Sequence, residues 1–519
     1  MERRKRNKKI RNARVMTANI FMAISVIVIT AALLLFAMGF SFNDSGKLEQ
    51  SGLLQVSSYP RSTTVEIDDE NQFTLTNVNK MLPTGNHTLK VTKPGYDTWQ
   101  RNVKIDAGLL TRIDWIRLFP LHPTIDNSDS FQDLHFVAFT PDRKHLLAIE
   151  KSSPNLLYID LQGDRLTRRT LPLSDLLSPL TKTTTQTETS AASDSSFNVD
   201  SLGKIDIIAW NNDNTKLIAT HKQGESVSWH LFDLETPANS HDLSTQFGLN
   251  FSNILIANDS ASKLWALENN KLHLIDIANL TVGSAIADNV EQITCNKGVV
   301  SYIATNPTTK ARTLNIYRDG ENASTKILDL ESDARVQLAM GTFWRDYWLA
   351  VSLNNVVEIY SDSAYPSSKK DSASFKRVFQ HSLEYTPSIV SVNQESRILA
   401  YASEKHLTTI DFETKDYYDS TPTISLQSLS WLDDYLFYER DTTHHKVTVR
   451  DFDGSNQREL LSATDADFPI NLTANNKYLY YFKFAPNTAD TGASESETPQ
   501  DSSATPSATY ILKRLHLNI

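Results

Sequence analysis

The first forty residues contain one long, predominantly apolar run that no charged residue interrupts. No charged residue lies between Val15 and Phe40, and most positions from Ile20 onward are Ile, Val, Leu, Phe, Met or Ala. About 20 such residues in a helix span the hydrocarbon core of a bilayer. The run therefore predicts a single transmembrane helix over residues 15–40, with the lipid bilayer as its partner.

The flanks of this run differ in charge. Residues 1–14 contain eight Lys or Arg and one acid, Glu2, whereas acidic sequence follows the run. The positive-inside rule places this basic tail in the cytoplasm and the rest of the chain outside, beginning with a linker over residues 41–51. A cleaved signal peptide is the alternative, but its apolar core is normally about 7–15 residues long. An uncleaved, single-pass anchor in the cell membrane is favoured.

Apolar and polar residues then alternate with the period of a β-strand over residues 52–122. The alternating runs are separated by turn residues such as Pro83, Gly85, Pro94 and Gly95. This pattern predicts a small β-sandwich. The alternating runs occupy residues 53–57, 64–68, 87–91 and 103–105.

Residues 52–119 resemble the PEGA domain family, a short β module. The resemblance rests on residues 52–60, 64–68, 82–87 and 93–96. The chain differs from the family at its namesake tetrapeptide, because Pro60 is followed by Arg-Ser-Thr rather than Glu-Gly-Ala. The resemblance implies an accessory module of the cell envelope and brings no catalytic residues.

From residue 131 to residue 519, a strand pattern of the form apolar, any, apolar, Asp, apolar recurs. From Asp233 to Asp276, on to Asp319, and from Asp411 to Asp451, the spacing is about 40 to 45 residues, the length of a four-stranded propeller blade. A polar turn and an apolar strand precede these copies. The copies lie at residues 157–161, 231–234, 274–277, 409–412 and 449–452, with looser ones at 316–319, 357–360 and 515–519.

Two longer intervals between copies contain Ser/Thr-rich stretches near residues 181–198 and 486–508, which are expected to be disordered insertions. The eight copies favour an eight-bladed β-propeller, with seven blades as the alternative. Because the last unit is one strand short, a strand before Phe136 is expected to complete it. The turn at residues 139–144 and the segment 449–460 resemble TolB-like and WD40-like propellers. The predicted fold class is all-β after the helix.

The charge and the cysteine content of the chain limit the kinds of partner and of covalent cross-link that are expected. The total charge is −10, and since residues 1–14 carry +7, the remainder carries −17. This acidic composition argues against a nucleic-acid partner, which would need a basic surface, so none is expected. Cys295 is the only cysteine, which excludes an intrachain disulfide. Its strand-like surroundings favour a buried, unreactive thiol.

The search for chemistry gives few candidates. The chain contains no P-loop, dinucleotide-binding glycine pattern, nucleophile elbow or zinc-binding His pair on a helix. His444 and His445, near Asp441, are expected in an exposed turn rather than at a metal. Trp344, Tyr347 and Trp348 could stack on a sugar or peptide but are expected to pack within a blade. No catalytic residue, cofactor or metal site is therefore predicted, and the ligand-binding residues are unknown.

The function expected from these features is non-catalytic. The chain would be an anchored extracytoplasmic binding or scaffold protein of the cell envelope, whose propeller presents a face to a protein, peptide or cell-wall glycan. One alternative is an anchored hydrolase or lyase with a site in the central channel, marked by convergent carboxylates. The other is a sensor ectodomain that acts through a membrane partner.

Overall fold

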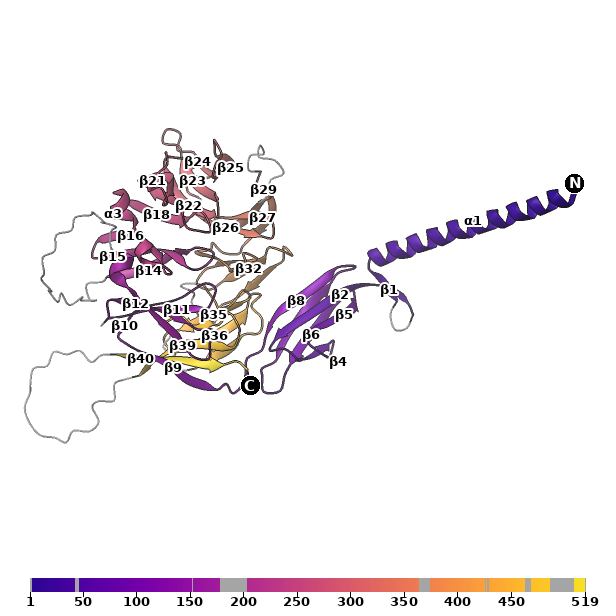
Figure 1. Cartoon of the computed structure of the whole chain (residues 1–519), viewed down its shortest axis with the longest axis horizontal. Helices are drawn as coiled ribbons and strands as arrows, with labels where there is room; N and C mark the ends of the chain where they lie inside the picture. The colour runs from indigo at the N-terminus through magenta and orange to yellow at the C-terminus, as the bar shows by residue number, and fades with distance from the viewer. Residues whose placement is uncertain are drawn as a thin grey trace, which may run out of the picture. The chain divides into compact units, whose positions relative to one another are not determined.

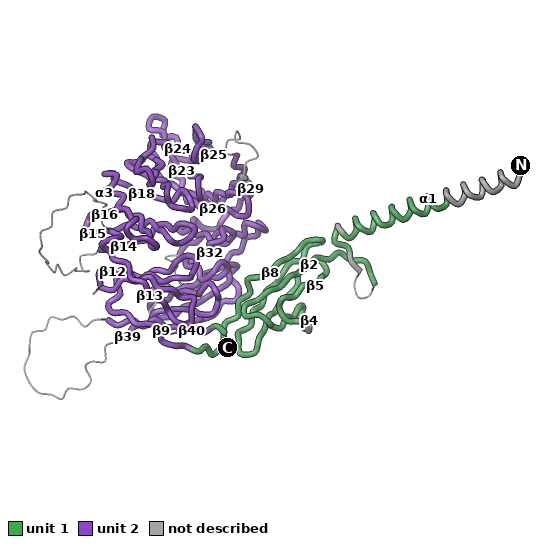
Figure 2. The backbone as a smooth tube through the Cα atoms, viewed as in Figure 1, with its two compact units in different colours: residues 1–124, 517–519 green, residues 125–516 purple. Residues whose placement is uncertain are grey.

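The structure is a computed structural model that describes residues 2–42, 46–151, 153–177, 203–363, 374–424, 426, 429–462, 468–485 and 508–518. The expected insertion at 181–198 lies outside the described residues, as does all but the last residue of the one at 486–508. The chain divides into two compact units, Met1–Thr124 with Leu517–Ile519, and Ile125–His516 (Figures 1 and 2).

Unit 1 begins with a single long helix, α1 (Glu2–Ala37). Within it, Met16–Phe36 are 21 residues with a mean hydropathy of 2.5, long and apolar enough to cross a membrane, and none of this stretch is buried. The helix ends before Gly39, whose φ of +81° is left-handed. A Cβ on Gly39 would lie 2.2 Å from the Gly108 nitrogen, so only glycine fits this close approach.

Two four-stranded sheets follow in unit 1 and enclose one apolar core. The strand β2 pairs with β1, with β5 and, in parallel, with β8, while the second sheet has the order β4-β3-β6-β7. Leu54 and Val56 from the first sheet share a buried cluster with Val65 and Leu89 from the second, which makes the predicted sandwich. The strands are β1 (Phe40–Phe42), β2 (Leu48–Tyr59), β3 (Thr64–Ile67), β4 (Glu70–Leu75), β5 (Val78–Pro83), β6 (Gly85–Thr92), β7 (Trp99–Ile105) and β8 (Leu110–Arg117).

The segment 41–51, expected as a linker, carries the end of β1 and the first residues of β2, which pair antiparallel from Phe40 opposite Gln50 to Phe42 opposite Leu48. Unit 1 also includes the end of the described chain. Tyr96 donates a hydrogen bond to the Leu517 carbonyl at 3.1 Å, and Tyr59 donates one to Asn518 at 3.1 Å.

Unit 2 contains eight four-stranded antiparallel sheets among its described residues. Sheets 1 to 4 comprise β10 (Leu134–Phe139), β11 (His145–Glu150), β12 (Asn155–Asp160), β13 (Thr167–Pro172); β14 (Lys204–Trp210), β15 (Lys216–Gln223), β16 (Ser226–Asp233), β17 (His241–Asp242); β18 (Phe251–Ile256), β19 (Lys263–Glu268), β20 (Lys271–Asp276), β21 (Thr281–Val282); and β22 (Val290–Asn296), β23 (Val299–Thr305), β24 (Arg312–Arg318), β25 (Thr325–Leu330).

Sheets 5 to 8 comprise β26 (Val336–Phe343), β27 (Asp346–Leu353), β28 (Val356–Ser363), β29 (Lys376–Ser382); β30 (Ile389–Val392), β31 (Ile398–Ala402), β32 (Leu407–Asp411), β33 (Tyr417–Ser420); β34 (Ser430–Trp431), β35 (Leu436–Asp441), β36 (Lys446–Asp451), β37 (Arg458–Leu461); and β38 (Asn471–Leu472), β39 (Tyr478–Ala485), β40 (Thr509–His516), β9 (Ile125–Gln132). Three short helical turns, α2 (Leu173–Leu177), η2 (Pro237–Asn239) and α3 (Leu243–Phe247), decorate the first two sheets.

The two repeated sequence signatures correspond to two turns that recur among the sheets. In the polar turn after the first strand, Arg143, Asn214 and Asn476 take a left-handed φ of 63°, 56° and 59°. In several sheets the third strand ends in an Asp that accepts backbone N–H groups of the next turn, as Asp160 does from Gln162 at 2.8 Å and Asp411 from Glu413 at 2.9 Å. The repeat is therefore a repeat of turn chemistry, and it marks the sheet boundaries.

Neighbouring sheets are joined through their faces and first strands. The first strands β14, β18, β22, β26 and β30 contact one another in succession. The strand β9, which precedes Phe136, pairs with β40 and completes the eighth sheet, as predicted. Phe131 on β9 shares a buried cluster with Leu146 of the first sheet. The all-β class with one N-terminal helix is confirmed and the sheets are consistent with a propeller, while the blade count stays a prediction.

Candidate functional site

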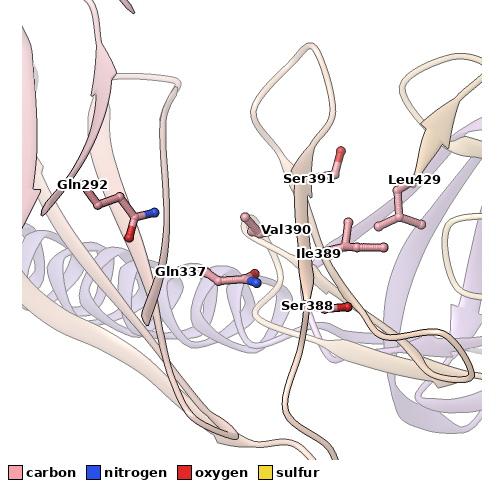
Figure 3. A pocket seen from close by; sticks show the side chains of 7 residues that line it. All are labelled: Gln292, Gln337, Ser388, Ile389, Val390, Ser391 and Leu429. Carbon is pink, nitrogen blue, oxygen red and sulfur yellow. The ribbon is translucent and has the colours of Figure 1, made fainter. Parts of the chain in front are cut away.

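The candidate site is an open pocket of about 480 Å³ between the first strands of successive sheets. Gln292 comes from β22, Gln337 from β26 and residues 389–391 from β30, as Figure 3 shows. The segment that leads to β34 contributes Leu429. The described lining is Gln292, Gln337, Ser388, Ile389, Val390, Ser391 and Leu429, which are four uncharged polar residues and three aliphatic ones.

Gln337 is the best-positioned polar group of this pocket. Its Nε2 donates to the Pro387 carbonyl at 3.2 Å, which fixes the orientation of the amide. Its Oε1 is buried and has no hydrogen-bond partner among the described residues. A buried amide oxygen without a partner is costly, and the side chain that carries it lines the pocket.

Ser391 and the residues around it are held from the neighbouring sheet. Trp431 on β34 donates its indole N–H to Ser391 Oγ at 2.9 Å, so the hydroxyl has one interaction already made. Among the lining residues that the structure describes, none is titratable. The pocket can therefore bind amide or hydroxyl groups and aliphatic surface, but it has no side chain to compensate a charge.

A cluster of carboxyl groups lies in the turns that follow β30 and β34. Asp434 Oδ1 accepts the backbone N–H of Glu395 at 3.3 Å, and the Asp434 carbonyl accepts a hydrogen bond from Asn393 at 3.0 Å. Burial, together with the charges of Glu395 and Asp433, raises the pKa of Asp434 to about 6, although Arg143 acts in the opposite direction. These acids arise from turns of different sheets, a convergence that no local motif reveals.

The aromatic residues singled out in the sequence separate in the structure. Trp348 is fully buried and donates its indole N–H to the Ser396 carbonyl at 2.9 Å. Trp344, by contrast, is 82% exposed at the turn between β26 and β27, with a left-handed φ of 56°. The expectation of packing within a blade holds for Trp348 and is wrong for Trp344, because a two-residue turn carries its side chain away from both sheet faces.

The remaining polar candidates lie in local structural roles. His444 and His445 lie exposed in the turn between β35 and β36, and His444 Nδ1 is 2.6 Å from an oxygen of Asp441. The described residues contain no group of three or more His, Cys, Asp or Glu side chains able to hold a metal. The Cys295 thiol donates to the Ile256 carbonyl at 3.3 Å, and burial raises its pKa to about 12.

Sequence reasoning missed Gln292 and Gln337 as functional candidates. Each is one polar residue in an ordinary alternating strand, and only the arrangement of first strands around a common space brings the two together. The one feature of the sequence that could have indicated them is a polar residue at the second or third position of a sheet's first strand. That signal has no specificity without the sheet boundaries.

Comparison with known protein families gives a match for one small part of the chain. Residues 51–116 match the model of the PEGA domain family. No curated protein sequence matches the chain. Because the match covers a small part of the chain, it defines the class of the small domain within unit 1 only.

Among solved structures, the chain is similar to Porphyromonas gingivalis dipeptidyl peptidase 4, with 9% identity and a TM-score of 0.44 over 69% of this chain and 56% of that one. It is similar to PorZ, a surface component of the type-IX secretion system of the same organism, with 12% identity and a TM-score of 0.36 over 71% and 44%. A eukaryotic initiation factor shows 10% identity and a TM-score of 0.38 over 69% and 83%. The chain spans about half the length of the first two. Likenesses this weak carry no argument about function.

Proposed function

We propose that this chain is a single-pass, membrane-anchored binding protein of the cell envelope rather than an enzyme. In this proposal α1 crosses the cell membrane with its basic end in the cytoplasm, and both units lie outside. The sheets of unit 2 close into an eight-bladed propeller of the TolB-like or WD40-like kind. The pocket between its first strands binds an extended, uncharged peptide segment of a partner protein.

The anchor is supported by length and charge. The 21 residues of Met16–Phe36, which are predominantly apolar, match the thickness of a bilayer core at 1.5 Å per helical residue. The eight basic residues of positions 1–14 precede them directly. The positive-inside rule then favours a cytoplasmic N-terminus.

The observation that carries the binding proposal is the chemistry of the pocket. A peptide backbone presents an N–H donor and a carbonyl acceptor at each residue, which suits the amides of Gln292 and Gln337. Aliphatic peptide side chains suit Ile389, Val390 and Leu429. A glycan is less favoured because the described lining offers no aromatic ring on which a sugar face could stack.

The test measures binding by the full-length protein in lipid nanodiscs. The probes are capped six-residue peptides with aliphatic and amide side chains, matched acidic and basic peptides, and neutral oligosaccharides. Neutral peptides are expected to bind, and Gln337→Ala is expected to weaken that binding about 5- to 10-fold, the value of one hydrogen bond. The matched control is Gln380→Ala on β29, the outer strand of the same sheet, where the side chain is exposed. A preference for charged peptides or for sugars, or equal effects of the two substitutions, would contradict the proposal.

The carboxyl cluster favours a second candidate function, an anchored propeller hydrolase or lyase. An Asp with a pKa near 6 beside two further carboxyl groups resembles the acid–base pairs of many hydrolases. Turnover of peptide, ester or glycoside substrates that is lost in Asp434→Asn would support this candidate over the first. No turnover of any of these substrates would remove it.

A further inference from the structure

One end of unit 1 carries a set of exposed aliphatic side chains, here called the apolar edge: Met81, Leu109 and Leu110, with exposed fractions of 47%, 60% and 55%. The strand register brings Met81 and Leu110 together. Leu53 on β2 lies opposite Met81 on β5 and opposite Leu110 on β8. Because directly paired residues point to the same face of a sheet, Met81, Leu53 and Leu110 form one apolar row across three strands. This row lies on the outer face, since Leu54 beside it is fully buried.

The apolar edge lies at the point where the chain leaves the helix. The Gly39 carbonyl accepts a hydrogen bond from the Ser51 N–H at 2.7 Å and another from the Ser51 hydroxyl at 3.2 Å. The Ser51 carbonyl in turn accepts the Gly108 N–H at 2.9 Å, and Leu109 and Leu110 follow Gly108 directly. Gly39 is three residues beyond Phe36, the last residue of the apolar stretch.

We propose that the apolar edge docks onto the lipid bilayer that α1 crosses, so that the small β domain is held against the membrane surface. This proposal rests on the anchoring part of the proposed function. We choose the bilayer as the partner because the apolar edge lies next to the end of the proposed membrane span. Residues hydrogen-bonded to Gly39 lie within a few ångströms of that end, where the headgroup and acyl layers of the bilayer meet. Each aliphatic side chain removed from water there gains about 25 cal/mol per Å² of buried surface, as amphipathic segments do at such an interface.

The same domain supplies a matched control at its other end. Leu121 is 59% exposed, and its N–H donates to the Gly95 carbonyl at 2.9 Å. It lies near the Tyr59 end of β2, because the Tyr59 carbonyl accepts the Leu118 N–H at 2.9 Å. From Leu53 to Tyr59 the strand rises by roughly 20 Å, which places a leucine of the same exposure well away from the apolar edge.

The experiment uses an environment-sensitive fluorophore on single introduced cysteines. Cys295, the one native cysteine, has a thiol whose pKa burial raises to about 12, so the unsubstituted chain serves as the labelling blank. Full-length Leu110→Cys and Leu121→Cys are labelled with nitrobenzoxadiazole and placed in phosphatidylcholine nanodiscs with and without lipids that carry a doxyl quencher. The label at position 110 is expected to emit at shorter wavelength and to be quenched several-fold more than the label at position 121. Equal emission and equal quenching at the two positions would overturn the proposal.

Two further measurements test insertion of the apolar row and the membrane anchor separately. In Met81→Cys, added Leu110→Asp is expected to lower quenching of the label at position 81, because a charge in the row opposes insertion, whereas unchanged quenching contradicts docking by the row. Alkaline carbonate washing of vesicles that contain the full chain tests the anchor itself. A chain that stays in the membrane with an unquenched label at position 110 contradicts the docking alone, whereas a chain released by carbonate contradicts the anchor as well.

Discussion

The pKa of Asp434 depends on residues from two neighbouring sheets. Its carboxyl group is removed from water in a turn of the seventh sheet and faces the charge of Glu395, which belongs to a turn of the sixth. Both effects disfavour the charged form and raise the pKa to about 6, and the positive charge of Arg143 offsets them only in part. The folded chain therefore keeps Asp434 protonated up to about pH 6, well above the pH at which an ordinary Asp loses its proton.

The first prediction concerns the pH dependence of stability. The folded pKa of Asp434, about 6, exceeds the unfolded value of about 3.9. Protonation of Asp434 thus stabilises the folded state by about 1–3 kcal/mol. This stabilisation is fully present below pH 4 and is lost as the pH rises through 6. Asp434→Asn, which stays neutral, is expected to be more stable than the original chain at pH 8 by that amount and no more stable at pH 4.

Urea unfolding at the two pH values measures this difference, and Glu395→Gln serves as a graded comparison because it removes only one of the charges that raise the pKa. It should give part of the gain seen with Asp434→Asn at pH 8. A gain for Asp434→Asn that is the same at pH 4 and pH 8 would show that charge is not its cause.

At the scale of one element, the seventh sheet is organised around a buried ion pair. Arg450 on β36 and Glu439 on β35 are 1% and 5% exposed, and the Arg450 guanidinium donates to the Glu439 carboxylate. Arg450 also donates to the Thr421 carbonyl at 3.0 Å, and Glu439 accepts the Thr423 N–H at 3.1 Å. The pair thereby ties residues 421–423 to the sheet, and these residues precede Leu429 of the pocket.

The second prediction distinguishes two roles of the Arg450–Glu439 pair: stabilising the seventh sheet and positioning residues 421–423. Glu439→Gln leaves Arg450 as a buried charge without a counterion, so the free energy of unfolding is expected to fall by about 3–5 kcal/mol. The double variant Glu439→Leu with Arg450→Met removes both charges and should recover most of that loss. Because it still lacks the hydrogen bonds to residues 421–423, its peptide binding is expected to remain weakened. Chemical unfolding and nanodisc binding measure the two effects, and a double variant as unstable as Glu439→Gln contradicts the account.

The elements of this chain differ in how far the sequence predicts them. Most sheet boundaries of unit 2 were predictable because two recurring turns need particular residues, such as the Asp160 carboxylate that accepts a following N–H. The helix and the small sandwich follow from hydrophobic period. The pairing of β1 with β2 was not predicted, because Phe40–Phe42 reads as the end of the apolar run. The pocket was not predicted. Gln292 and Gln337 line it together because their sheets are neighbours, and the residue pattern of a single strand does not show which sheets are neighbours.

At the scale of unit 2, stability depends on how the first and last sheets meet. The strand β9 comes from the beginning of the unit and pairs with β40 from its end, with Phe131 opposite Tyr510. Phe131 is fully buried, 5.9 Å between ring centroids from Phe482 of the eighth sheet, and shares its cluster with Leu146 of the first. A neighbour on both faces of every sheet would distinguish a closed ring from an open stack.

The third prediction tests this closure through cooperativity. Phe131→Ala removes a buried aromatic ring, at a cost of about 3–5 kcal/mol. In an open stack, stability is a sum over nearest neighbours, so the terminal sheets of the variant would unfold in a separate, earlier transition. In a closed ring, loss of β9 exposes the faces of sheets 1 and 8 together and leaves the other sheets without closure, so a single transition should move to lower urea.

Trp265→Ala, which empties a fully buried site in the third sheet, provides the comparison. If the ring is closed, the two variants lower the same transition by similar amounts, and hydrogen exchange in β9 and in β23 reports the same opening free energy. If β9 exchanges well before β23 in Phe131→Ala, the ends of the array act independently of its middle.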